Sequence, residues 1–461
     1  MLKNNVFAIA FCLVLVGYQQ NAMAQMYESE GRMICCGDSL LTGNAQAIRV
    51  NPAFLSQRGK KVSTFGFLQI GFNFHSNQLN FAEVLRFGFS DNVIPELERQ
   101  DILDRGDDQT AYIWNANLDF TWLSYSVFDP KFGGLSISLR DRINQRSLIP
   151  NEFLGVLFFG TNSPAFEELT PDQRLSIGNG TQTQYTHLRE LTLSYARSIV
   201  KQENFSIDLG ATFSKIWGVG YFDSYIDNQR LRGGSSFSAF YDVDYSSVSS
   251  SLENISGGLL DTSGGGFLLD LGVDMKVKGL GRFSASILDI GSMNWNDNIT
   301  VADADFETVL GGVGDGIIQN YSIIENLDRL YDASNHQPGP AFTSPFATKL
   351  RLNTLFYLGP SMNISTDFMI PLRSFDNELP MFYNPAFYSG YFNWSPLDGI
   401  VNLSAGVFYG AEVNFRIPVG VSIGLTESLF VSLAVNDINT IFLRGIDPFA
   451  GVSINFMNIK Y

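Results

Sequence analysis

The chain has 461 residues, of which 45% are hydrophobic and only 16% are charged, against the roughly 25% charged residues typical of soluble domains. Its 46 acidic and 30 basic residues give a net charge of −16, which argues against nucleic acid as a partner because attraction to phosphate requires basic patches. Beyond the N-terminus no run reaches the roughly 20 apolar residues of a membrane helix, so the apolar surface must be spread over shorter segments.

Residues 1–24 have the pattern of a secretory signal peptide. Lys3 supplies the positive start, Val6–Val16 is the apolar core, and Ala22-Met23-Ala24 is a cleavage site of the small-x-small type. A membrane anchor is the alternative, but the apolar core is too short for one and no stop-transfer pattern follows it. We therefore expect an exported protein that begins at Gln25.

Residues 25–63 lack the alternation of a strand and are predicted to form a periplasmic or plug-like segment. Asp38–Leu41 could start a short helix, and Asn51-Pro52-Ala53 follows shortly before the first strand. The adjacent Cys35 and Cys36 predict no disulfide framework, because neighbouring cysteines close only a strained ring. Their pairing with a partner and their persistence as two thiols remain alternatives.

From residue 64 onward, long stretches alternate between apolar and polar residues, as β-strands with one apolar face do. The clearest is a hairpin over Arg189–Phe222, in which the apolar row from Phe205 to Phe213 alternates with serine, aspartate, glycine and threonine, and Lys201–Asn204 forms the turn. We expect the apolar row to face lipid and the polar row to face the lumen. Fourteen such strands are predicted, at residues 64–75, 111–128, 134–146, 189–200, 205–222, 266–277, 282–295, 346–358, 362–372, 387–394, 402–411, 414–425, 429–435 and 449–458.

The connections between these strands alternate between short and long, as in bacterial outer-membrane barrels, where the short turns lie on the periplasmic side. The exception is the junction near Glu412-Val413, which must lie on the outer side but is short. Ser236–Ser246 also alternates, but a fifteenth spanning strand would break this rule, so we interpret it as a hairpin or extension above the membrane. Sixteen strands are the alternative if that segment has a partner. Short helices are expected in the long loops, at Ile94–Arg105, Asn151–Gly160 and Ser322–Tyr331.

The fold class predicted over residues 64–461 is therefore an all-β, transmembrane antiparallel barrel. A large soluble sandwich or propeller is the competing interpretation. It is disfavoured because the strands are longer than the usual five to six residues and no repeat of about 40–50 residues is present.

The sequence offers no catalytic or metal-binding pattern, so we predict no enzyme activity and no cofactor. The three histidines, His75, His187 and His336, lack the spacing of a metal site, and His187 is interpreted as an ordinary histidine at the rim of a strand. No glycine-rich loop leads from a strand into a helix to hold phosphate. The acidic stretches at residues 96–108 and 303–307 are interpreted as solvated loops rather than calcium sites.

Several short motifs resemble the FadL family of outer-membrane long-chain fatty-acid transporters. Asn51-Pro52-Ala53 looks like a signature that this family places shortly before its first strands. Further segments are similar to the Bacteroidetes branch of that family, the PorV-like proteins of type IX secretion: Gly43-Asn44-Ala45, Tyr195-Ala196-Arg197, Gly264-Gly265-Gly266-Phe267, and Asp289-Ile290-Gly291 followed by Trp295.

The resemblance implies a monomeric fourteen-stranded barrel in outer-membrane lipid, with Asn51, Pro52 and Ala53 in a plug inside the lumen. It also implies that an apolar substrate enters from outside and leaves through a lateral opening at a strand kink. The polar inward row of the Arg189–Phe222 hairpin departs from an apolar channel. Two functions therefore compete: transport of hydrophobic small molecules, and a platform for secretion-system proteins. A barrel enzyme is a distant third.

Overall fold

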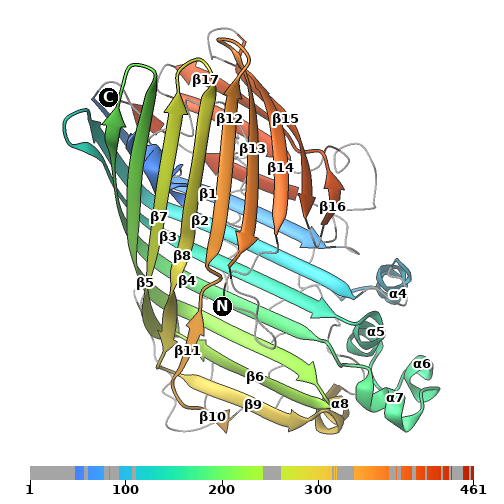
Figure 1. Cartoon of the computed structure of the whole chain (residues 1–461). Coiled ribbons are helices and arrows are strands. Elements are labelled where there is room, and N and C mark those ends of the chain that lie inside the picture. Colours follow the sequence, from blue (N-terminus) through green and yellow to red (C-terminus); the bar gives the residue numbers. More distant parts are fainter. Residues whose placement is uncertain are drawn as a thin grey trace.

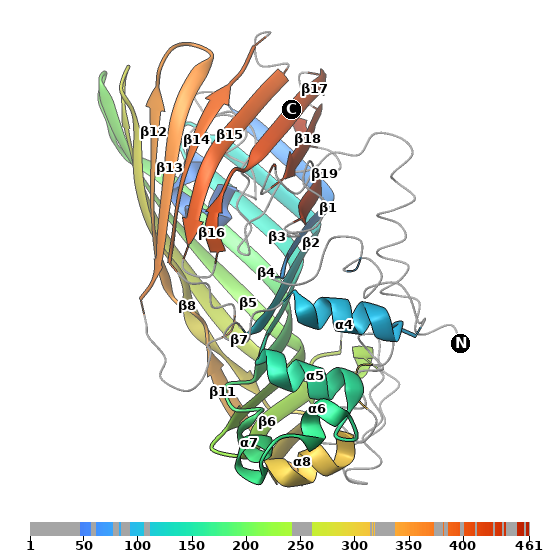
Figure 2. The ribbon, with the colours of Figure 1, turned by 90° about the vertical axis from the view of Figure 1, so that its right-hand side faces the viewer.

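The computed structural model describes residues 47–56, 61–76, 83, 93–105, 111–241, 261–313, 316, 318, 337–372, 381, 386–396, 401–410, 413–426, 429–435, 438, 450–455 and 458–460. The expected signal peptide, Cys35, Cys36 and the expected helix at Ser322–Tyr331 lie outside these residues. The described strands form one tilted antiparallel wall that closes on itself (Figures 1 and 2).

The barrel closes because the first strand, β1 (Val62–Ser76), pairs with β2 on one side and with β19 and β20 on the other. Fourteen spanning strands result when β16 with β17 and β19 with β20 are each counted once, which confirms the predicted fold. The others are β2 (Tyr112–Asp129), β3 (Gly133–Ile149), β4 (Gln182–Lys201), β5 (Phe205–Asp227), β7 (Gly264–Val277), β8 (Gly281–Trp295), β12 (Lys349–Tyr357), β13 (Met362–Pro371), β14 (Phe387–Trp394), β15 (Val401–Gly410), β16 (Val413–Arg416), β17 (Val419–Thr426), β18 (Leu429–Val435), β19 (Ala450–Asn455) and β20 (Asn458–Lys460).

Several predicted strand boundaries were wrong. β4 begins at Gln182 rather than at residue 189, and β5 ends at Asp227 rather than at residue 222. The twelfth strand is broken between β16 and β17 at Ile417 and Pro418, where proline has no N–H to donate to a ladder. The eighth strand begins at Lys349 rather than Phe346, because a separate short strand, β11 (Phe342–Pro345), precedes it.

The wall is taller on one side, where β4 and β5 reach 20 and 23 residues (Figure 1). The outer part of β5 pairs with β6 (Arg230–Phe237), β6 pairs with β9 (Ile299–Asp305), and β9 pairs with β10 (Gln337–Pro338). Of the segment Ser236–Ser246, interpreted as a hairpin or extension above the membrane, Ser236 and Phe237 end β6, Ala239–Tyr241 forms the 3₁₀ turn η4, and residues 242–246 lie outside the described residues. The extension itself is present, and β9 was not predicted.

Helices cover this extension at the end of the barrel opposite the short turns (Figure 2). The predicted helices at 94–105 and 151–160 are present as α4 (Glu96–Asp104) and α5 (Asn151–Phe159). Three further helices lie at this end: α6 (Pro164–Glu167), α7 (Pro171–Ser176) and α8 (Phe306–Val313). Arg105, which follows α4, donates hydrogen bonds to both carboxylate oxygens of Glu83, and this raises the pKa of its guanidinium. None of the helices in the described ranges has the length and apolar character of a membrane span.

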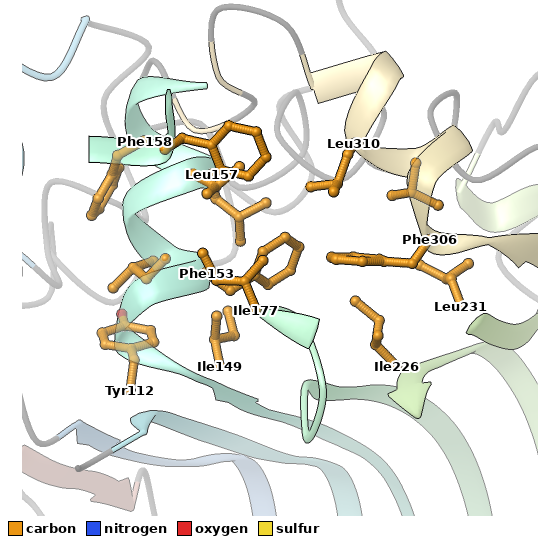
Figure 3. Close-up of a cluster of buried hydrophobic side chains, with 14 of the residues drawn as sticks. Tyr112, Ile149, Phe153, Leu157, Phe158, Ile177, Ile226, Leu231, Phe306 and Leu310 are labelled. Atoms are coloured by element: carbon orange, nitrogen blue, oxygen red, sulfur yellow. The ribbon is translucent and has the colours of Figure 1, made fainter. Parts of the chain in front are cut away.

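The helices and strand ends share a hydrophobic core, which we call the outer core (Figure 3). Phe153 of α5 packs against Phe306 of α8 with ring centroids 5.4 Å apart, and both side chains are at most 1% exposed. Ile226 of β5 and Leu231 of β6 close the core from the sheet side. This end of the molecule is thus a helix-on-sheet unit with its own core rather than a set of loops.

The two faces of the wall differ as the alternation predicts. On β5, Leu209 and Phe213 are 44% and 49% exposed, whereas Asp208 and Thr212, which point into the lumen, are 4% and 3% exposed. The outward apolar side chains continue around the barrel as a lipid-facing band. Its members include Leu135, Ile137, Leu191, Leu193, Tyr195, Phe267, Leu269, Leu271, Leu352, Ile364, Phe368, Tyr388, Phe392, Leu403 and Val407.

We expect nitroxide labels on neighbouring residues of β5 to report opposite environments. A label at Leu209→Cys should collide readily with oxygen, which is enriched in lipid, whereas one at Asp208→Cys should be shielded from lipid, because successive side chains of a strand point to opposite faces. Power-saturation EPR in proteoliposomes measures both. A lipid-exposed label at Asp208 would overturn the register of the whole hairpin.

Candidate functional site

The segment before β1 lies inside the barrel as two 3₁₀ turns, η2 (Ala47–Arg49) and η3 (Pro52–Ser56) (Figure 1). Asn51 is fully buried between them, and its Nδ2 donates to the carbonyl oxygens of Val273 and Ala285 at 3.0 and 3.1 Å. Its Oδ1 accepts from the N–H of Ala53 at 2.9 Å, so one side chain both shapes the turn and binds it to β7 and β8.

The wall receives this segment on a row of small residues that runs across five strands. The strand registers align Gly134, Ala196, Gly210, Gly272 and Ser286 as successive partners on β3, β4, β5, β7 and β8. A Cβ at Gly210 would overlap the backbone of Pro52 and Ala53, one at Gly272 would overlap Asn51, and one at Gly134 would overlap Leu55. The hydroxyl of Ser286 donates to the carbonyl of Val50 at 2.8 Å. We call this row the small-residue row.

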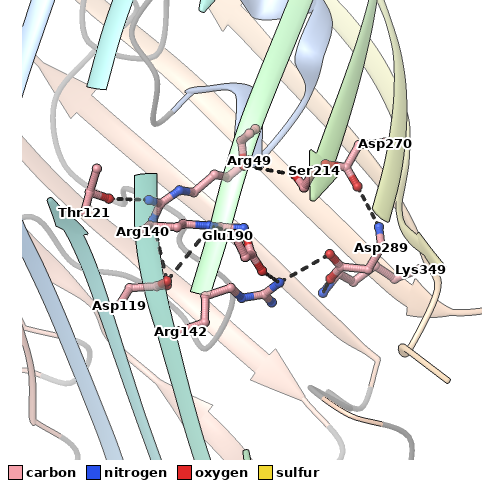
Figure 4. Close-up of polar contacts among 11 residues, drawn as sticks. Arg49, Asp119, Thr121, Arg140, Arg142, Glu190, Ser214, Asp270, Asp289 and Lys349 are labelled. Carbon is pink, nitrogen blue, oxygen red and sulfur yellow. Dashed lines mark hydrogen bonds and ion pairs between the residues drawn. The ribbon is translucent and has the colours of Figure 1, made fainter. Parts of the chain in front are cut away.

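Farther from the short turns the lumen is crossed by ion pairs, the central charge cluster (Figure 4). Glu190 of β4 is fully buried and accepts from Arg140 at 2.5 Å and from Arg142 at 3.0 Å. Arg142 also lies 3.5 Å from Asp289, which binds Lys349 at 2.8 Å. Arg49, the last residue of η2, donates to Thr121 and lies 3.8 Å from Asp119, so the cluster joins the segment inside the lumen to the wall.

The turns η2 and η3 and the central charge cluster thus occupy the lumen at these two levels. A small cavity of about 30 Å³ lies between Ile48, Ser138, Asp270 and Lys349, which is room for only a few water molecules. An apolar molecule has little contact to gain there, because all but two of the lining residues, Ile48 and Leu288, are charged or hydroxyl-bearing.

The inward side chains become apolar toward the helix-covered end of the barrel. A cluster of buried residues gathers there from β4, β5, β7, β8 and the segments that follow β11 and β13, and we call it the inner apolar cluster. Trp295 lies near its centre, with its ring 5.1 Å from that of Tyr221 and 6.4 Å from that of Phe342. The members are Leu188, Ile216, Tyr221, Leu268, Met293, Trp295, Phe346 and Met381.

This cluster borders an interruption in the wall. β8 pairs with β11 through Ser292–Trp295 and with β12 through Gly281–Leu288, while Asp289–Gly291 and Phe346–Thr348 between them form no regular ladder. The N–H of Phe346 still donates to Gly291 at 3.2 Å. Asp289 adopts a left-handed conformation, with φ 56°, at a bulge in the pairing of β7 with β8. The same residue thus belongs to the central charge cluster and to the wall interruption.

The prediction that His187 is an ordinary rim histidine was wrong. It is 2% exposed, and its Nδ1 lies 2.5 Å from the hydroxyl of Tyr241 in η4. It shares the outward face of β4 with Arg189, which binds Asp141 at 2.8 Å, and the turn η4 covers that face. Within the part of the chain that the structure describes, no three His, Cys, Asp or Glu side chains gather as a metal site would require.

The predicted residues Asn51, Pro52 and Ala53 are brought together inside the lumen, and their role as a plug remains a prediction. The small-residue row and the central charge cluster were not singled out from the sequence. The available signal was the inward row itself, since charged residues on a lumen-facing row must find partners across the barrel.

A protein family with the description "Family of unknown function (DUF5723)" matches residues 52–435. The chain belongs to this DUF5723 family. The family region begins at Pro52 and spans η3, the helix-on-sheet unit that contains the outer core, and the barrel as far as Val435 in β18. No curated protein matches the chain.

Among solved structures, the chain is similar to the toluene transporter TbuX of Ralstonia pickettii, with 10% identity, a TM-score of 0.43, and coverage of 96% of this chain and 100% of the other. It is similar to the toluene transporter TodX of Pseudomonas putida, with 11% identity, a TM-score of 0.43 and coverage of 96% and 98%. It is also similar to a FadL homologue of Pseudomonas aeruginosa, with 10% identity, a TM-score of 0.40, and coverage of 96% of this chain and 98% of the other. The similarity is too distant to carry an argument about substrate, and the resemblance to PorV-like proteins stays a prediction.

Proposed function

We propose that this DUF5723 protein is an outer-membrane barrel that transports hydrophobic small molecules and releases them sideways through the wall. The observation that carries the proposal is the inner apolar cluster beside the wall interruption. An apolar molecule gains free energy by leaving water for such a cluster. Asn51–Ala53 and the central charge cluster close the straight path along the lumen, so the interrupted ladder between β8 and β12 is the exit that this geometry favours.

The proposal gives the charged lumen a role. A sealed lumen would keep ions and water-soluble solutes out while the side path admits apolar ones. An apolar substrate offers no partner to these buried charges, so separating them would leave each charge desolvated and unpaired. The substrate would therefore not displace them. The polar inward row of β5, which departs from an apolar channel, then belongs to the seal and not to the substrate path.

We expect Met293→Gln to lower the uptake of radiolabelled ethylbenzene into proteoliposomes about tenfold, since an amide placed in an apolar site without a hydrogen-bond partner costs about 1–3 kcal/mol. The matched control is Met369→Gln on β13, because both methionines are fully buried and only Met293 belongs to the inner apolar cluster. Equal uptake by the two variants would contradict the proposed path. If the native protein takes up no more ethylbenzene than empty liposomes do, transport itself is wrong.

One observation favours the second function, a platform for secretion-system proteins of the PorV-like kind. The outer core gives the helix-covered end a folded unit, including Phe153 and Phe306, that the barrel does not need for closure. A rigid scaffold at the surface positions the residues that bind a partner, and this unit supplies such a scaffold. Absence of ethylbenzene uptake would leave this function in place.

A further inference from the structure

Two polar atoms in or beside the inner apolar cluster have no hydrogen-bond partner among the described residues. The first is the indole Nε1–H of Trp295, a side chain that is 0% exposed. The second is the hydroxyl of Thr186, also 0% exposed, which faces Tyr221 across the pairing of β4 with β5. Both groups therefore neighbour the same tyrosine, whose ring packs against Trp295.

An unpaired indole N–H in the interior is costly, because burial removes its bond to water and nothing replaces it. The chain pairs another indole: Nε1 of Trp122 donates to Asp141 at 2.9 Å. Other buried polar atoms of the chain also lack a partner, but Trp295 and Thr186 place two of them beside the same ring of the inner apolar cluster. Unsatisfied donors inside an otherwise apolar site are what a ligand with a complementary acceptor would complete.

The charge around the cluster limits the acceptor to an uncharged one. Indole and hydroxyl are neutral donors. The nearby lumen cations are already bound, with Lys349 on Asp289 and Arg142 on Glu190. Asp223 lies two residues from Tyr221 on the same face of β5, and it would repel a carboxylate.

We propose that the inner apolar cluster selects apolar molecules that carry one uncharged hydrogen-bond acceptor, such as a ketone or ester carbonyl, over plain hydrocarbons and over carboxylates. Trp295 donates its indole N–H to that acceptor, and Thr186 supplies a second polar contact. This inference rests on the proposed transport function and names the substrate class of the same site.

Three probes of nearly equal size test it: ethylbenzene, acetophenone and benzoate, titrated by calorimetry into the full-length protein in lipid nanodiscs. We expect acetophenone to bind about five- to tenfold more tightly than ethylbenzene, the value of one net hydrogen bond. Trp295→Phe, which keeps an aromatic ring but removes the N–H, should bring the two affinities within about twofold. Thr186→Val should reduce the preference in the same direction.

The matched control is Trp217→Phe, since Trp217 follows the cluster residue Ile216 on β5 and points to the opposite face of the wall. This variant should keep the full preference for acetophenone. Equal binding of ethylbenzene and acetophenone to the native protein would overturn the inference but not transport, and so would a preference that survives in Trp295→Phe. Benzoate binding as tightly as acetophenone would overturn the uncharged acceptor. Failure of every probe to bind would overturn both proposals.

Discussion

The variant Gly210→Val is expected to expel Asn51–Ala53 from its seat in the lumen. A valine side chain at this position would overlap the backbone of Pro52 and Ala53, and these cannot shift independently because Asn51 binds β7 and β8. Overpacking of this kind costs about 1–3 kcal/mol, which raises the undocked population about 5- to 150-fold.

The labelling rate of a cysteine at Ser56 measures this population. Ser56 is 6% exposed, so a water-soluble maleimide should react slowly with Ser56→Cys when Cys35 and Cys36 are replaced by serine. Adding Gly210→Val should raise the rate by the same factor as the undocked population. Adding Ala211→Val should not, because the neighbouring residue points toward lipid. Equal rates in the two variants would show that the small-residue row does not hold the segment.

The strands were predictable because their signal is local. Leu209 and Asp208 reveal the two faces of β5 within two residues of sequence, and no knowledge of the partner strand is needed. The same period of two fixed which face of the barrel each residue occupies. Strand ends were less predictable. Pro418 breaks its strand because β15 pairs with β16 and β17 on either side of it and proline has no backbone N–H to donate, and that pairing is not visible in the sequence.

What the sequence could not supply is the register between distant strands. Gly134, Ala196, Gly210 and Gly272 form one row only because three separate strand pairings place them at the same height. The pairing of β6 with β9 was unpredictable for the same reason, since it joins distant segments: Arg230 binds Asp303 across 73 residues of chain. The polar character of the inward residues of β5 was visible in the sequence, but its cause was not. The cause is that the chain's own segment η2–η3 lies against this part of the wall.

The central charge cluster gives the second large expected effect. Glu190→Gln keeps the shape of the side chain but leaves Arg140 and Arg142 without their shared carboxylate in a site that is fully buried. Removing one partner of a buried ion pair costs about 3–5 kcal/mol, because the charges left behind stay desolvated. Urea unfolding of the protein in detergent, followed by the loss of the heat-modifiable barrel band, measures this change in stability.

The chain carries its own control for this variant. Asp303 also lies between two arginines, Arg230 at 2.8 Å and Arg232 at 3.9 Å, but its side chain is 59% exposed. Asp303→Asn should cost less than about 1 kcal/mol, since water solvates the arginines once the carboxylate is gone. Equal losses in the two variants would mean that desolvation does not set the strength of the central charge cluster. A large loss for Glu190→Gln alone would show that desolvation sets the strength of the central charge cluster.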